Sequence, residues 1–196
     1  MEKKAKKGKN SKLIIMLAII ILVVIIAIVC FLLVMPKSNN LTNNPADEEI
    51  KQVIEQLDGV YDICMVTEDN DPNGNLNKQG GYTGAVYFRL EQVDEALKDE
   101  AINRYGEEFV NSGDWENFYD EAKDTCDAGT GAGGQIEIYP NKSTAEKRDE
   151  YLSTLDGFLS GGYHIVEGSL VIRVSDELPS SQQKEIANNI INLLKK

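Results

Sequence analysis

Residues 13–35 read LIIMLAIIILVVIIAIVCFLLVM, a run of 23 positions without a charged side chain. A helix rises about 1.5 Å per residue, so a helix of this length would cross the hydrocarbon core of a bilayer, which is about 30 Å thick. The run therefore predicts a single transmembrane helix. We expect it to divide the chain into a tail (1–12), a span (13–35), a linker (36–46) and a folded domain (47–196).

The charges on either side of the run predict its orientation. The first twelve residues contain six lysines and one acidic residue, whereas the other side offers Lys37 and then Asp47, Glu48 and Glu49. Lysines beside a span stay cytoplasmic, so we expect a cytoplasmic N-terminus and an extracytoplasmic C-terminal domain. The expected location is the cell membrane, with the membrane itself as a partner through residues 13–35.

A cleaved secretory signal has the same charge layout and is the alternative to an anchor. The apolar part of such a signal usually spans about 7–15 residues and ends in small residues, whereas this run is longer and ends in FLLVM. A lipoprotein signal needs a small residue before its lipidated cysteine, and Val29 precedes Cys30. These departures favour an uncleaved signal anchor.

The acidity of the domain excludes some partners. The chain has 20 basic and 32 acidic residues; since the first twelve residues hold six of the former and one of the latter, residues 13–196 carry a net charge of −17. Binding to nucleic acid requires a basic face that neutralises phosphates, so we expect no nucleic-acid partner. An acidic surface suits solubility, cations or basic partners. The length after the linker fits one domain.

Hydrophobic periodicity predicts the elements of the folded domain in the order α-β-β-α-α-β-α-β-α. The expected strands fall near residues 60–67, 82–90, 135–139 and 163–174, the last of them bent or folded into a hairpin at Gly168, and one expected helix contains Trp115. This order predicts an α+β fold, with one small mixed β-sheet and helices packed on one face. The second half, strand–helix–strand–helix, is ferredoxin-like.

Two of the three cysteines fall in the folded domain. Cys64 and Cys126 would lie outside the cell, where disulfides persist, and a bridge between them would close a long loop. The alternative is two buried, reduced thiols. Pairing cannot be deduced from sequence, so both interpretations stay open.

The acidic loop between the first two strands predicts a candidate calcium site. Asp69, Asp71 and Asn73, followed by Gly74, match the D-x-D-x-N-G opening of a calcium-binding loop, and Asn75 occupies its next ligand position. The twelfth position is Gly80 where a bidentate glutamate is expected, and the flanking segments are predicted strands. The alternative is an ordinary polar turn, because Asp, Asn, Pro and Gly are also the usual turn residues.

No complete set of catalytic residues is visible. His164 is the single histidine, so neither an H-E-x-x-H zinc site nor a histidine-rich one can form, and no G-x-S-x-G motif accompanies it. We expect His164 to be a strand residue with its polar tip at the surface. The glycines of residues 129–134 match G-x-G-x-x-G, but a strand follows them where a nucleotide site needs a helix. We therefore expect no cofactor, except calcium at the loop.

Four segments carry a resemblance to a known group of proteins. They are residues 66–74 (VTEDNDPNG), 80–83 (GGYT), 133–139 (GGQIEIY) and 170–178 (LVIRVSDEL). Together they resemble an uncharacterised family of membrane-anchored envelope proteins and lipoproteins of Gram-positive-type bacteria, over roughly residues 60–196. The resemblance implies an envelope location and an α+β domain. No activity is established for the family, so it implies no catalytic residue.

Three functions are compatible with the sequence. The first is a non-enzymatic module, anchored by one span, that binds a partner or ligand in the bacterial cell envelope. The second is a surface domain stabilised by calcium at Asp69, Asp71, Asn73 and Asn75. The third is an envelope hydrolase that uses a pair of carboxylates, which in a glycosidase lie about 5–9 Å apart in a concave site. Because no catalytic set is complete, we expect the first.

Overall fold

The computed structural model describes residues 15–16, 44–112, 124–155 and 162–196. The chain divides into two compact units, residues 1–38 and 39–196, and the elements below belong to the second. Its elements are α2 (Asp47–Ile54), β1 (Val60–Met65), β2 (Gly84–Leu90), α3 (Glu91–Tyr105), α4 (Glu107–Asn111), α6 (Thr125–Ala128), the 3-10 helix η1 (Gly129–Ala132), β3 (Gly133–Ile138), α7 (Lys142–Ser153), β4 (Tyr163–Glu167), β5 (Leu170–Val174) and α8 (Ser180–Leu194).

Several sequence predictions fall on residues that the structure does not describe. The predicted span 13–35 is one of them, apart from Ile15 and Met16, and the helix expected around Trp115 is another. Among the residues that are described, no helix has both the length and the apolar character that a bilayer crossing requires.

The strands form one five-stranded sheet in the order β1-β2-β3-β5-β4. Every neighbouring pair is antiparallel. The α+β class is therefore confirmed, and the prediction of a mixed sheet is wrong. The reason lies in the hairpin β4–β5. The helix α7 connects β3 to β4, which run in the same direction, but β5 lies between them, so no two parallel strands are neighbours.

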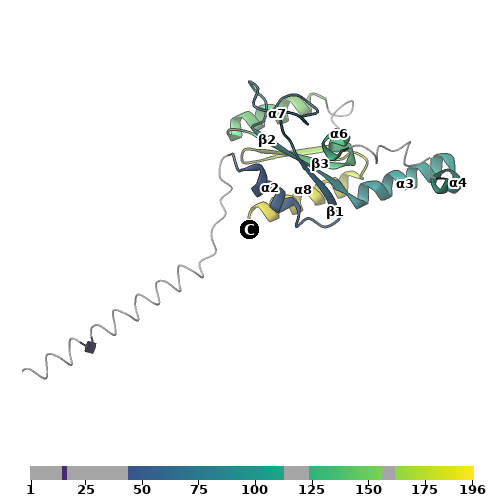
Figure 1. Cartoon of the computed structure of the whole chain (residues 1–196), viewed down its shortest axis with the longest axis horizontal. Helices are drawn as coiled ribbons and strands as arrows, with labels where there is room; N and C mark the ends of the chain where they lie inside the picture. The colour runs from purple at the N-terminus through teal and green to yellow at the C-terminus, as the bar shows by residue number, and fades with distance from the viewer. Residues whose placement is uncertain (1–14, 17–43, 113–123, 156–161) are drawn as a thin grey trace, which may run out of the picture. The chain divides into compact units, whose positions relative to one another are not determined.

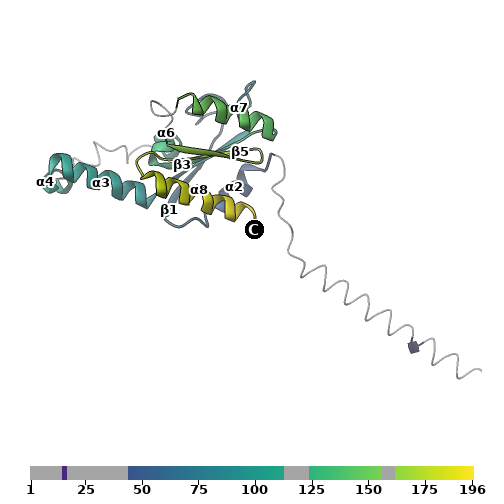
Figure 2. The same cartoon turned by 180° about the vertical axis from the view of Figure 1, so that it is seen from behind.

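Helices cover both faces of the sheet, which corrects the prediction of helices on one face. On one face α2 and α8 pack against alternate strand residues in the larger core, whose largest buried side chains include Phe88, Ile136 and Ile172. On the other face α6 and α7 pack against a second core, which contains Tyr87, Cys126 and Val171. Figures 1 and 2 show α7 on one side of the sheet and α2 and α8 on the other. We call these the α7 face and the α8 face.

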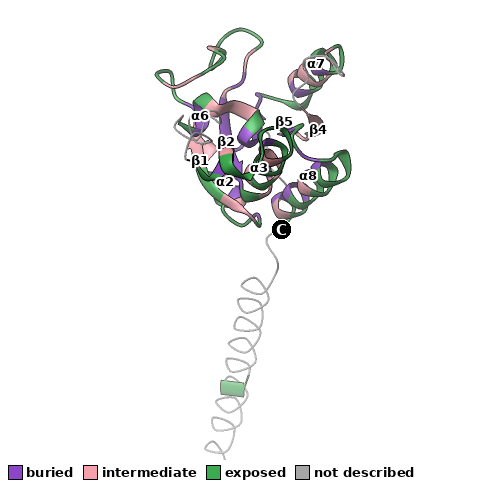
Figure 3. Cartoon of the chain, turned by 90° about the vertical axis from the view of Figure 1, so that its right-hand side faces the viewer, coloured by how far each residue is buried: buried purple, intermediate pink, exposed green. Residues whose placement is uncertain are grey.

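The central strands are buried on both sides. All seven residues of β2 and all six of β3 are buried, because a hydrophobic core packs against each face of the sheet. In Figure 3, β2 carries the colour of buried residues, and the helices around the sheet carry many exposed ones. Because α7 and α8 lie on opposite faces, the ferredoxin-like description of the second half is also wrong: in that fold both helices share one face.

Candidate functional site

A row of mostly polar side chains crosses the α7 face of the sheet. Strand register makes Cys64, Tyr87, Gln135, Arg173 and His164 successive partners from β1 through β2, β3 and β5 to β4. Gln135 is fully buried, and its side-chain oxygen accepts a hydrogen bond from Nη1 of Arg173 at 3.1 Å. Burying a polar side chain costs free energy unless it forms hydrogen bonds. The hydrogen bond between Arg173 and Gln135 offsets part of this cost and fixes the two side chains relative to each other.

Glu137 lies two residues after Gln135 on the same face of β3, and it forms the centre of a buried ionic cluster. Its side chain is fully buried. Arg148 of α7 binds both carboxylate oxygens, with Nε and Nη2 each 2.9 Å from their acceptors. The hydroxyl of Tyr139 donates to the carboxylate at 2.8 Å, and Nη1 of Arg173 lies 3.6 Å from it. We call these four residues the Glu137 cluster; it fastens α7 to the sheet.

Burial and nearby charges shift the pKa values of two cluster residues, Tyr139 and Arg148, and of the neighbouring Tyr87. Burial raises the pKa of the Tyr139 hydroxyl, and the neighbouring charge of Glu137 raises it further. Burial and the same charge raise the pKa of Tyr87 to about 12. Burial alone would lower the pKa of Arg148, but its hydrogen bonds and charge attraction to Glu137 outweigh this and raise it. The tyrosines therefore stay neutral and Arg148 stays charged at physiological pH, as a structural cluster requires.

Asp149, the residue of α7 that follows Arg148, contacts His164 of β4, which is the single histidine of the chain. Nδ1 of His164 lies 2.7 Å from Oδ1 of Asp149, and the His164 side chain is 8 % exposed. The prediction that its polar tip lies at the surface is therefore wrong. The physical reason is that α7 covers this face of β4 and supplies the carboxylate that a buried imidazole needs.

A groove of about 540 Å³ runs along β4, an edge strand that is flanked by α7 and α8. Its lining residues come from α7, β4, α8 and the glycine before β4: Asp149, Ser153, Gly162, Tyr163, His164, Ile165, Val166, Ser180, Gln183 and Lys184. On the α8 side the ammonium of Lys184 lies 5.9 Å from the centroid of the Tyr163 ring. The two walls thus differ in chemistry, with a carboxylate–imidazole pair on one and an ammonium on the other.

Backbone groups of β4 face outward into this groove. The N–H of Tyr139 donates to the C=O of Ser169, and the N–H of Ser175 donates to the C=O of Gly133. Since Ser169 and Ser175 flank β5, the odd-numbered residues of β5 bond to β3. In an antiparallel ladder successive residues bond to opposite neighbours, so the even-numbered residues of β5 bond to β4. Their partners on β4 are the odd-numbered residues, which include Ile165 and Glu167.

Residues 164 and 166 consequently direct their N–H and C=O groups away from the sheet. The N–H of Val166 has no acceptor in the described part of the chain. At the start of the strand, the N–H of Tyr163 is already bonded to Oε1 of Gln183 at 2.7 Å. The N–H of Val166 is therefore the open main-chain donor that the described part of this edge offers.

The other edge of the sheet, β1, has a smaller groove of about 330 Å³ that contains two carboxylates, Glu55 and Asp62. Glu55 lies 3.8 Å from the ammonium of Lys51, and Asp62 accepts a hydrogen bond from the hydroxyl of Thr125. A glycosidase needs a carboxyl that donates its own proton and a second one across the cleft. Both carboxylates here already have structural partners, which does not favour that chemistry.

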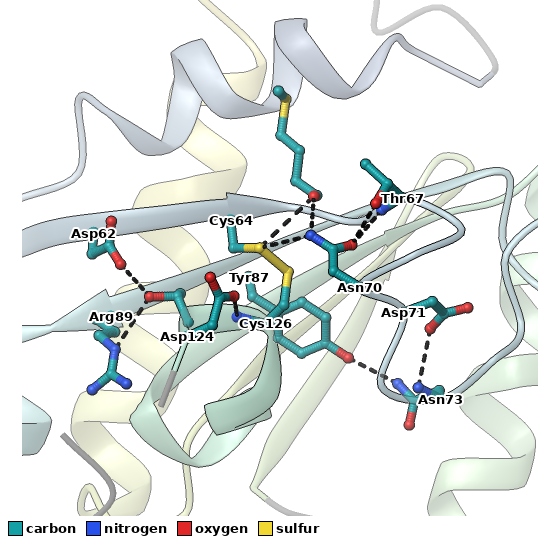
Figure 4. Close-up of a disulfide and its surroundings, with 12 residues drawn as sticks. Asp62, Cys64, Thr67, Asn70, Asp71, Asn73, Tyr87, Arg89, Asp124 and Cys126 are labelled. Atoms are coloured by element: carbon teal, nitrogen blue, oxygen red, sulfur yellow. Dashed lines mark hydrogen bonds between the residues drawn. A yellow bond between two sulfur atoms is a disulfide. The ribbon is translucent and has the colours of Figure 1, made fainter. Parts of the chain in front are cut away.

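Cys64 of β1 and Cys126 of α6 form a disulfide, with their Cα atoms 5.5 Å apart (Figure 4). This distance lies within the limit of about 7 Å that a disulfide requires. The side-chain amide of Asn70 donates to Sγ of Cys64 at 3.4 Å and to the C=O of Met65 at 3.2 Å, so the loop after β1 packs on the bridge and caps that edge. The disulfide joins the sheet to the segment that precedes β3.

The four residues of the candidate calcium site do not act alike. One carboxylate oxygen of Asp71 accepts from the N–H of Asn73 at 3.0 Å and from the hydroxyl of Tyr82, and the other accepts from the N–H of Leu76 at 2.7 Å. Partial burial alone would raise the pKa of Asp71, but these hydrogen bonds outweigh it and lower the pKa. The amide of Asn73 donates to the hydroxyl of Tyr87 at 2.8 Å (Figure 4).

The remaining two predicted ligands, Asp69 and Asn75, are exposed. Both carboxylate oxygens of Asp71 thus already accept hydrogen bonds within the loop. Within the described residues, the group of Cys, His and acidic side chains close enough to hold a metal ion is Cys64, Asp124 and Cys126, and its two cysteines are bonded to each other. The calcium site stays a prediction.

The glycine-rich residues 129–134 form the 3-10 helix η1 and the start of β3. A strand follows the motif, as the sequence predicts, and not the helix that a dinucleotide site needs. Gly133 and Gly134 allow close packing, because a Cβ at Gly133 would lie 2.3 Å from the C=O oxygen of Phe88. These glycines therefore serve the packing of β3 between its neighbours.

No protein-family model, curated protein or solved structure matches this chain.

Proposed function

We propose that this chain is a single-pass, membrane-anchored module of the bacterial cell envelope that acts by binding, with an extended segment of a partner adding to the edge of β4. Three observations support the proposal. Residues 13–35 carry no charge and follow six lysines. The Cys64–Cys126 disulfide suits an oxidising compartment outside the cytoplasm. The groove along β4 lies between two helices, and at its edge the N–H of Val166 has no acceptor among the described residues.

The groove along β4 carries the proposal. When a strand adds to an open sheet edge, its main-chain hydrogen bonds supply affinity and its alternate side chains enter pockets on the two faces. Val166 offers the unpaired N–H. Side chains of the added strand would alternately meet Asp149 and His164 on the α7 side and Lys184 on the α8 side.

Binding explains this groove better than catalysis does. Ser153 and His164 line the groove with Asp149, which suggests a hydrolytic triad, but the Ser153 hydroxyl makes no hydrogen bond to His164. A serine nucleophile needs that contact with its base. Ser153 is the last residue of α7, and the end of a helix presents free carbonyl oxygens, whereas an oxyanion needs N–H donors.

Substitution of Val166 by proline tests the proposal. Proline removes the outward N–H that an added strand would bond, and an edge position whose N–H faces solvent tolerates it. We expect the full-length Val166→Pro protein to lose capture of its envelope partner from membrane extracts, as detected by quantitative mass spectrometry, while its melting temperature changes little.

Ile63→Pro is the matched control, because Ile63 occupies the equivalent outward-facing position on the opposite edge strand, β1. It should retain the captured partner. Equal retention by both proline variants would refute strand addition at β4, and so would equal loss in variants that remain folded.

A further inference from the structure

We propose that Cys64, Cys126 and Asp124 bind a zinc ion when the disulfide is reduced, so that the metal replaces the bridge between β1 and α6. The sulfur atoms of the two cysteines and a carboxylate oxygen of Asp124 all lie within 4.8 Å of one another. Figure 4 shows Asp124 beside the bridge. Thiolate and carboxylate groups are among the zinc ligands that proteins use. The site lies apart from the lining of the groove along β4 and does not depend on the proposed strand addition.

The backbone already holds the two cysteines at a separation that zinc can use. Zinc bonds to thiolate sulfur at about 2.3 Å in a tetrahedral arrangement, which places two bound sulfurs about 3.8 Å apart. The Cα atoms of Cys64 and Cys126 are 5.5 Å apart. Rotation of the two side chains can therefore open the sulfurs to the required distance without separating β1 from α6.

The local structure fixes Asp124 next to Cys126. Asp124 is the N-cap of α6, and its Oδ1 accepts a hydrogen bond from the N–H of Cys126 at 2.9 Å. Its other carboxylate oxygen, Oδ2, has no hydrogen bond to the described part of the chain. Asp124 is exposed whereas Cys126 is fully buried, so the carboxylate gives the site an opening to solvent.

A hydrogen-bond donor is already directed at one of the sulfurs. The side-chain oxygen of Asn70 accepts from the N–H of Thr67 at 2.6 Å and from its hydroxyl at 3.0 Å, which fixes the orientation of the amide. Nδ2 of Asn70 therefore faces Sγ of Cys64, at 3.4 Å (Figure 4). A hydrogen bond to the charged form of a group favours that form, so Asn70 stabilises the Cys64 thiolate that zinc requires. Partners that hydrogen-bond to a metal ligand also strengthen metal binding.

Zinc binds only after the disulfide has been opened. A dithiol reductant transfers two electrons and two protons to the bridge, which yields two cysteine thiols and leaves the reductant as a disulfide. Zinc then displaces both thiol protons and bonds to the two thiolates and to the Asp124 carboxylate. Water completes the tetrahedral site. A covalent link between β1 and α6 is in this way replaced by a metal link.

Cobalt binding tests the site in the full-length protein in detergent, with Cys30 replaced by alanine and the disulfide reduced by a phosphine. Bound Co²⁺ reports on its ligands, because thiolates give a charge-transfer band in the near ultraviolet and tetrahedral coordination gives intense visible bands. We expect both kinds of band, their loss when zinc displaces cobalt, and neither in the oxidised protein. A reduced protein that is folded but lacks the charge-transfer band would overturn the proposal.

Two substitutions in and beside α6 test the carboxylate ligand. Asp124→Asn keeps an oxygen that can cap α6 but removes the carboxylate, so the dissociation constant for cobalt should rise at least ~10-fold. Asp127→Ala is the matched control, because Asp127 is an exposed acid of the same helix outside the ligand group. It should bind cobalt like the parent. Equal dissociation constants for the two variants would contradict the assigned ligand set.

Zinc should also stabilise the reduced protein, because an ion that binds the folded state alone raises the melting temperature. We expect this rise in the reduced parent and none in the Cys64→Ser/Cys126→Ser variant. An equal rise in both would show that zinc binds elsewhere and would overturn the proposal. None of these results alters the capture expected for Val166→Pro, so failure of the zinc site is distinguishable from failure of strand addition.

Discussion

Replacement of Glu137 by alanine is expected to lower the free energy of unfolding by about 3–5 kcal/mol, because it leaves buried positive charge without its partner. The carboxylate is fully buried and binds Arg148 through two hydrogen bonds, while Arg173 lies 3.6 Å away. Removing it takes away the buried carboxylate that Arg148, Arg173 and the hydroxyl of Tyr139 share. Urea unfolding of the full-length protein in detergent, followed by circular dichroism, measures the change.

Glu146→Ala is the control for this experiment. Glu146 pairs with Lys142 at 3.4 Å on the outer side of the same helix, where both side chains are more than half exposed. Its removal should change the unfolding free energy by less than about 1 kcal/mol. If Glu137→Ala is as mild as Glu146→Ala, then the Glu137 cluster does not hold α7 on the sheet, and the α7 wall of the groove loses its structural basis.

Loss of the Cys64–Cys126 disulfide is expected to lower the free energy of unfolding by about 2–4 kcal/mol, because the unfolded chain regains the freedom of a long loop. The two cysteines are 62 positions apart. The bridge also anchors α6 to β1, so its loss should loosen the segment that leads into β3. Urea unfolding of the Cys64→Ser/Cys126→Ser protein, beside the parent, measures the effect.

A reductant provides the control for the disulfide. Dithiothreitol should shift the unfolding curve of the parent toward that of the double serine variant and leave the variant unchanged. A parent protein whose unfolding midpoint is insensitive to reductant under partly denaturing conditions would show that the two sulfurs are not bonded in the folded protein.

Much of the fold was readable from local sequence patterns, but the pairing of the strands was not. Residues 82–90 and 169–174 are rich in β-branched and aromatic residues and predict strands, which the structure confirms as β2 and β5. The insertion of β5 between β3 and β4 depends on contacts between segments far apart in the chain. Periodicity reports on each segment alone, so it could not distinguish this antiparallel order from a mixed sheet.

The same limit explains what sequence reasoning missed at the site. Glu137 stands between Ile136 and Ile138, a pattern that is typical of a strand with one solvent-exposed face. The glutamate is buried instead, because Arg148 arrives from α7 to pair with it. The pairing of His164 with Asp149 arises in the same way. No spacing rule links these residues, since their contacts depend on where α7 crosses the sheet.

The proposed function presupposes that the folded domain stands outside the cell, and a protease added to intact cells tests that claim most directly. We expect an impermeant protease to degrade residues 44–196 and to leave a small, membrane-embedded fragment that contains the lysine-rich N-terminus. A full-length protein that survives in intact cells, yet is digested once the membrane is permeabilised, would place the domain in the cytoplasm and contradict the proposed orientation.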